Sequence, residues 1–136
     1  MAHPDVEQAF RDRLTANFDR CPLVPDGDPN AGSNGGAFLV LQFPFSTSAQ
    51  TTIGAPDENV YREEGGARFV LSVPRRFQAI ADGKQWCVEI AALFRGKEFD
   101  GVRTWAPTSP FSDDTNDTGS FYVLTVVVPY SWDLIG

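Results

Sequence analysis

The residues best suited to nucleophilic or acid–base chemistry are few and scattered in this sequence. His3 is the single histidine, and it stands beside the N-terminus, where a chain end is expected to be solvated and frayed. Cys21 and Cys87 show no CxxC spacing and have no histidine nearby, so they indicate neither a zinc site nor a disulfide framework. Cys87 also falls among apolar positions, which favours packing in a core over service as a nucleophile. We therefore predict that the protein is not an enzyme and has no catalytic residue, metal site or cofactor.

Two other patterns imitate ligand-binding motifs without completing them. Residues 114–119 match the first half of a calcium loop, but the twelfth position is Thr125 rather than Glu, so the bidentate ligand is missing. The glycine-rich residues 32–36 lack the Gly-Lys-Ser/Thr of a phosphate loop, and no helix is expected after them. We therefore interpret residues 114–119 as a turn and residues 32–36 as a flexible loop.

The net negative charge of the chain limits the partners that it is expected to bind. The 136 residues carry a formal net charge of −7, whereas phosphate contacts demand clustered Lys and Arg, so we expect no specific nucleic-acid binding. The pair Arg75-Arg76 has no basic stripe around it. No apolar run approaches the roughly 18 residues of a membrane span, and the N-terminus lacks the basic and apolar regions of a signal peptide. We predict a single domain over residues 1–136, in a reduced cytoplasmic setting and without a membrane partner.

Two amphipathic helices are predicted from apolar spacing. Over residues 4–19, apolar side chains recur every four positions, from Val6 to Phe18. Over residues 76–95 they recur at three- and four-residue spacings, although Asp82-Gly83 interrupts the pattern at a cost of about 1 kcal/mol relative to Ala. Gly96 is a natural stop for this second helix.

Strand character is concentrated in short segments rich in Val, Phe and Thr, which are bounded by turn residues. The predicted strands are residues 37–45, 59–63, 67–73, 98–106 and 121–130. Gly65-Gly66 is expected to turn the chain, residues 46–58 fit either a long loop or an exposed hairpin, and residues 22–36 fit an irregular connection. The predicted fold is α+β, with an antiparallel four- to five-stranded sheet and two helices packed on one of its faces.

Aromatic side chains exceed what a monomeric core of this size accounts for. The chain has 11 Phe, 3 Tyr and 3 Trp, and large rings often carry protein–protein contacts. A second interpretation also stays open, in which these rings pack under long loops. The rings in or beside predicted loops are Phe43, Phe45, Tyr61, Trp105, Phe111, Tyr130 and Trp132.

The second half of the chain resembles a known family in three stretches. These are Asn59–Phe69 (NVYREEGGARF), Glu89–Val102 with EIAALFRG followed by FDGV, and Tyr122–Tyr130 with YVL followed by VPY. Together they resemble small phage proteins often labelled DUF4128, which look like the tail terminators, or tail completion proteins, of long-tailed phages and gene transfer agents. The resemblance covers residues 59–132 well and the N-terminal helix loosely, and none of the motifs is a catalytic signature.

The resemblance implies a structural role in a virion. A tail terminator forms a ring, here expected to be a hexamer, that caps the finished tail tube, stops its polymerisation and joins the tail to a head-completion or neck protein. The expected location is the tail and neck of a virion that is assembled in the host cytoplasm. Acidic side chains around the lumen of such a ring would repel DNA in transit.

Two interface hypotheses follow for particular residues. The hairpin Asn59–Gly66, which carries Tyr61 and Arg62, and the loop at residues 46–58 are expected to contact the tail tube or the adjacent subunit. Trp105, Tyr130 and Trp132 are assigned to packing between subunits. The alternatives are another neck or tail adaptor subunit of the same particle, and a small ligand-binding α+β domain whose aromatic residues line a pocket.

Overall fold

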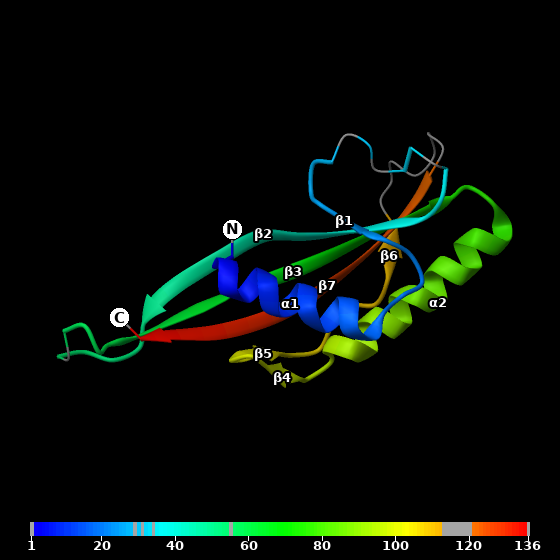
Figure 1. The fold of residues 1–136 in the computed structure, drawn as a ribbon. Helices are drawn as coiled ribbons and strands as arrows, with labels where there is room; N and C mark the ends of the chain where they lie inside the picture. The colour runs from blue at the N-terminus through cyan, green and yellow to red at the C-terminus, as the bar shows by residue number, and fades with distance from the viewer. Residues whose placement is uncertain are drawn as a thin grey trace.

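The computed structural model describes residues 2–28, 30, 32–33, 35–54, 56–112 and 121–135. The turn predicted over residues 114–119 therefore lies outside the described residues. In Figure 1 the long twisted sheet extends beyond the helices at one end. In chain order the elements are α1 (Pro4–Asn17), β1 (Leu23–Val24), β2 (Phe38–Gln50), β3 (Val60–Pro74), α2 (Phe77–Phe94), β4 (Glu98–Phe99), β5 (Val102–Thr104), β6 (Phe111–Ser112) and β7 (Phe121–Ile135).

Helix α1 confirms the first predicted helix. Pro4 occupies the first turn, and His3 caps it by accepting a hydrogen bond from the backbone N–H of Asp5 at Nδ1, at 3.1 Å. The frayed N-terminus expected for His3 is wrong, because the backbone N–H of His3 also donates to Oε1 of Glu63 at 3.1 Å. A contact 60 residues away in sequence therefore orders the start of the chain.

Helix α2 confirms the second predicted helix and runs through Asp82-Gly83 without a break. A Cβ at position 83 would lie 3.0 Å from Cγ1 of Val73 and 3.2 Å from Cδ1 of Leu124. Glycine is used here because it lets the helix approach the sheet closely, which compensates for its low helix propensity. The hydroxyl of Thr104 donates to the carbonyl of Phe94 at 2.5 Å, so β5 satisfies one of the free carbonyls at the end of α2.

The α+β class is correct, but the predicted antiparallel four- to five-stranded sheet is wrong. The sheet has seven strands in the order β1-β2-β3-β7-β5-β4, with β6 also paired to β7, and it curls into a half-barrel. It is mixed because β1 pairs in parallel with β2. Strands β1 and β6 were missed because each has only two residues, which is too short for a hydrophobic period to appear in the sequence.

Two predicted turns also differ from the structure. Gly65-Gly66 lies inside the 15-residue strand β3, because β2 and β7 pair with both sides of this segment. Asp100 and Gly101, with φ of 47° and 83°, form a tight hairpin turn that divides the strand predicted at residues 98–106 into β4 and β5. Of the two options for residues 46–58, the structure shows a hairpin, since β2 continues to Gln50.

The core lies between the two helices and one face of the sheet, which we call the inner face. Alternate residues of β3 and β7, such as Phe69 and Val126, point into it and are fully buried. Phe10 of α1 is its centre, because its ring packs against that of Phe94 at a centroid distance of 5.2 Å and against four other aromatic rings. Neither described helix has the length and apolar character needed to cross a membrane.

Candidate functional site

The two cysteine thiols are shielded from solvent to different degrees, since Cys87 is buried and Cys21 is half-buried. Burial raises the pKa of the Cys21 thiol to about 11 and that of the Cys87 thiol to about 12. Both thiols are therefore protonated near neutral pH, which removes the thiolate that attack or metal binding requires. Within the described residues, no group of three or more His, Cys, Asp and Glu side chains could hold a metal ion.

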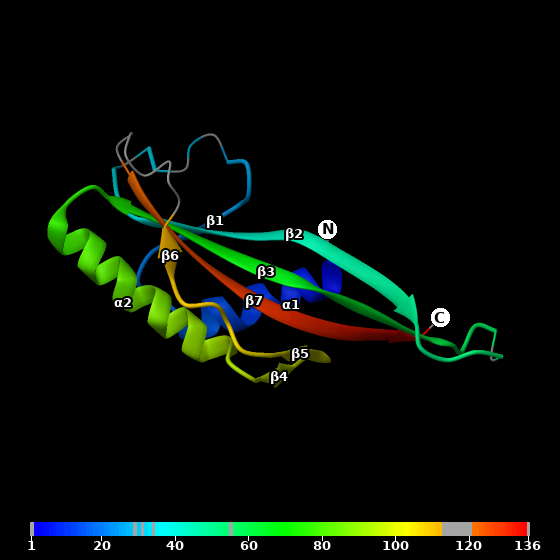
Figure 2. The ribbon, with the colours of Figure 1, turned by 180° about the vertical axis from the view of Figure 1, so that it is seen from behind.

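The second face of the sheet, which we call the open face, is covered by neither described helix, and Figure 2 views the fold from the side opposite to Figure 1. Three large aromatic side chains stand exposed on it: Phe45 at 57%, Trp105 at 48% and Phe111 at 46%. They line two adjoining hollows that share Phe45, of about 740 Å³ and about 410 Å³. Val70 and Val127 contribute to the apolar floor of the larger one. The open face thus presents a continuous apolar groove.

Local backbone geometry decides that Phe45 lies in this groove. An irregularity in the pairing of β2 with β3 falls between Gln42 and Phe45. Phe43 consequently packs into the core against Phe10, with ring centroids 5.5 Å apart, whereas Phe45 lies over Gly66 on the opposite face. A Cβ at position 66 would lie 2.8 Å from Cζ of Phe45, so glycine makes room for the ring.

The far ends of β2, β3 and β7 form a projecting arm, which we define as residues 46–54, 56–64 and 131–135. Figure 1 shows it extending past the N-terminal end of α1. Tyr61 is half-buried in the arm, and Arg62 is exposed and pairs with Asp133 across the strands, with Nε to Oδ1 at 2.8 Å. This pair lowers the pKa of Asp133 chiefly through the hydrogen bond from Arg62. The two residues predicted to contact a partner therefore lie on one extended element.

The three residues assigned to subunit packing divide between the two faces. Trp105 lies on the open face, whereas Tyr130 is buried in the core, where its hydroxyl donates to Oε2 of Glu63 at 2.7 Å. Trp132 is half-buried, and its ring centroid lies 4.6 Å from that of His3. The structure thus places Trp105 where a partner could reach it and places the other two rings where they connect α1 to the root of the arm.

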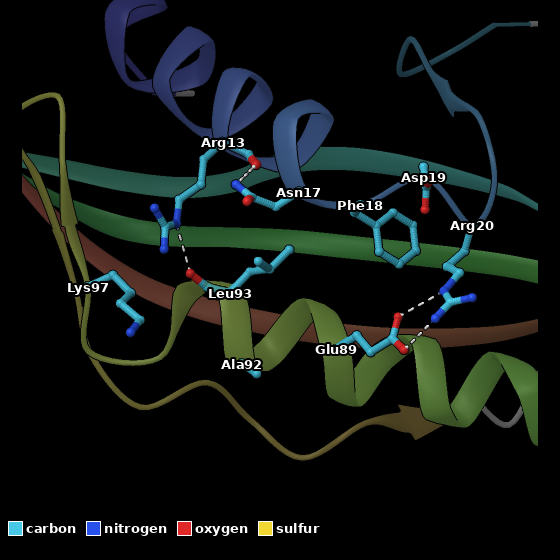
Figure 3. Close-up of a pocket in the computed structure, with 9 residues that line it drawn as sticks. All are labelled: Arg13, Asn17, Phe18, Asp19, Arg20, Glu89, Ala92, Leu93 and Lys97. Carbon is cyan, nitrogen blue, oxygen red and sulfur yellow. Dashed lines mark hydrogen bonds and ion pairs between the residues drawn. The ribbon is translucent and has the colours of Figure 1, made fainter.

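A third hollow, of about 500 Å³, lies between the end of α1 and the last turns of α2 (Figure 3). Arg20 approaches Glu89 with two hydrogen bonds of 3.1 and 3.2 Å. Arg13 donates from Nε to the carbonyl of Leu93 at 2.8 Å and lies over the ring of Phe99, 5.3 Å from its centroid. Both guanidinium groups already form hydrogen bonds within the chain. We therefore interpret this hollow as part of the contact between the two helices and not as a binding site.

The exposed side of α2 carries apolar side chains that were not predicted to face solvent. Phe77 and Val88 belong to the apolar spacing that predicts a helix over residues 76–95, yet they are 90% and 47% exposed. Their positions 11 residues apart place them on one side of a helix, which is a signal that the sequence does contain. The pattern alone could not show that the core lies on the other side.

Comparisons with known proteins give the fold but not a function. No family model matches the sequence, and no curated protein matches it. The structure matches 14 chains of solved structures. One of them is 19% identical, has a TM-score of 0.58, and is covered over 96% of its length by 97% of this chain; its name states no activity, ligand or partner. At this identity the likeness shows a shared fold alone.

Proposed function

We propose that this chain is a structural virion protein that forms a ring, of six copies, on the end of a phage tail tube. In this role it stops polymerisation of the tube and joins the tail to the head-completion or neck protein. The partners are further copies of the chain, the tail tube protein and the neck protein, and the location is the tail and neck of the virion.

The observation that carries the proposal is the apolar groove on the open face. Phe45, Trp105 and Phe111 leave large ring surfaces in water, in a sheet whose other face is fully packed. Exposed apolar patches rimmed by polar groups mark sites of protein association. The groove is rimmed by Arg68, which donates to Oε1 of Gln42 at 2.6 and 2.8 Å, and by Glu64. The sequence resemblance over residues 59–132 supplies the identity of the neighbours.

The charge of the chain agrees with the passage of DNA through such a ring. A net charge of −7 gives a lumen lined by this protein no general affinity for phosphate. We expect no specific contact with nucleic acid.

Tail length and head joining provide the test. Particles assembled without this chain should have overlong tails and few joined heads, and the wild-type chain should restore both. Phe45→Ser is expected to reduce the yield of joined particles at least tenfold while the melting temperature stays within a few degrees of wild type, because the ring is half-exposed in the isolated chain. Ala16→Ser, on the exposed side of α1, serves as the control. Normal tails without this chain would refute the proposal.

Two other functions are separated by different measurements. The 740 Å³ hollow is large enough for a small ligand, and a ligand-binding domain would be a monomer whose melting temperature rises with ligand. An adaptor subunit of the same particle would leave tail length normal when it is missing. Native mass of the assembled species distinguishes the first alternative, and images of the tails distinguish the second.

A further inference from the structure

The exposed side of α2 is an apolar stripe with several positive charges on or beside it. Phe77, Ala81, Val88 and Ala92 follow one another at spacings of four, seven and four residues, so they share one side of the helix, and all four are exposed. The exposed basic residues on or beside this stripe are Arg75, Arg76, Lys84 and Arg95.

The two acidic residues of α2 are each engaged with another side chain. Glu89 is bound to Arg20, and Asp82 accepts a hydrogen bond from Gln78 at 3.0 Å. The stripe is therefore both apolar and cationic in a chain whose net charge is −7.

The tip of the arm has the opposite character. Ile53 is 92% exposed, and Ile135 at the end of β7 is also exposed, so the arm carries apolar surface into solvent. Asp57 and Glu58 stand beside Ile53 in the hairpin, both are exposed, and neither forms an ion pair within the described part of the chain. The tip therefore combines apolar side chains with unpaired negative charge.

The arm cannot place its tip on α2 of the same chain. Both views show the tip at one end of the molecule and the first turns of α2 at the other, with the length of the sheet between them (Figures 1 and 2). Strand β3 pairs along its whole length with β7, from Val60 to Pro74, so the arm continues the sheet and does not fold back. Among the described residues, the arm tip can therefore reach an α2 stripe only on another copy of the chain.

We propose that the arm of one copy binds the α2 stripe of the next copy in the ring. The contact joins two different surfaces, so each subunit donates an arm and receives one, and repetition of the contact closes a ring when the rotation fits. Apolar contact at Ile53 and Val88 supplies affinity, and the acidic tip against the cationic stripe fixes orientation and speeds encounter. The inference rests on the proposed ring and states which surfaces make it.

Two variants, each disabled on one surface, test the contact. Ile53→Asp removes the arm's apolar anchor, and Val88→Asp places a charge in the centre of the stripe. Each variant alone is expected to lose the ring, with self-association weakened at least a hundredfold. Because both side chains are exposed, the melting temperatures should stay near that of wild type. Ala16→Asp, which adds the same charge on α1, should leave the ring intact.

Mixing the two variants gives the decisive result. The Val88→Asp chain keeps its arm, and the Ile53→Asp chain keeps its stripe, so together they retain one good contact. The expected product, by native mass measurement with one variant mass-tagged, is a one-to-one heterodimer and nothing larger.

Two different failures can be distinguished. Rings that persist in both variants, or an equal mixture that stays monomeric although each surface is intact in one chain, would overturn this contact and leave the proposed ring standing. A wild-type chain that is monomeric both in solution and in the native particle would overturn the contact and the proposed function together.

Discussion

The hydroxyl of Tyr130 donates a 2.7 Å hydrogen bond to the carboxylate of Glu63, on the inner side of the sheet where the arm begins. The same carboxylate accepts the backbone N–H of His3. The N-cap of α1, the first part of β3 and the second half of β7 are thus joined at one carboxylate, which makes it the anchor of the arm on the body of the protein.

Removing this hydroxyl should destabilise the protein. Tyr130→Phe keeps the buried ring and deletes a hydrogen bond to a charged acceptor, for which we expect a loss of about 1.5–3 kcal/mol in the free energy of unfolding. Denaturant unfolding measures this loss. Tyr61→Phe is the control, since the hydroxyl of Tyr61 has no hydrogen bond within the described residues, and it should change stability by less than about 0.5 kcal/mol. If the two substitutions lowered the free energy of unfolding equally, the stabilising role of the Tyr130–Glu63 hydrogen bond would be contradicted.

Stability should fall at alkaline pH because of the buried thiols. The pKa of Cys87 is about 12 in the folded protein, whereas an exposed thiol ionises near pH 8.5. Above that pH the unfolded chain loses a proton that the folded chain keeps, so ionisation favours unfolding. Urea unfolding between pH 7 and pH 10 should show a steady loss for the wild type and a shallower one for Cys87→Ala, although that variant starts from lower stability. If stability fell equally with pH in the wild type and in Cys87→Ala, ionisation of the Cys87 thiol would be ruled out as the cause.

Truncation of one phenylalanine on each helix should change the free energy of unfolding by very different amounts. Phe10 is fully buried among five aromatic rings, so Phe10→Ala is expected to cost about 3–5 kcal/mol. Phe77 is exposed, so Phe77→Ala should change the stability of the isolated chain by less than about 0.5 kcal/mol. Thermal and denaturant unfolding of the two variants test this contrast directly. A large loss for Phe77→Ala would place its ring in the core.

Adding a single methyl group to α2 should weaken its packing. On helix propensity alone, Gly83→Ala would stabilise the protein by about 1 kcal/mol. The new Cβ, however, would lie only 3.0 Å from Val73 and 3.2 Å from Leu124, and overpacking of this kind costs about 1–3 kcal/mol. We expect a net loss of about 1 kcal/mol in chemical denaturation. A gain in stability would show that the interface between α2 and the sheet relaxes freely.

The sequence by itself determined the two helices. Their apolar residues recur with a period close to the helical turn, so the pattern in a single segment contains the information. It also marked the aromatic residues as an excess over core needs, and Phe45, Trp105 and Phe111 prove to be exposed.

Only the tertiary structure decided the sheet and the face on which each ring lies. Strands β1 and β6 are too short to have a period, and Gly65-Gly66 extends within β3 because neighbours on both sides hydrogen-bond to it. A shift of one residue in register exchanges the two faces of a strand, so sequence alone could not separate Phe43 from Phe45, or Trp105 from Tyr130. Register depends on pairing between segments far apart in the chain, and that information is not present in any one of them.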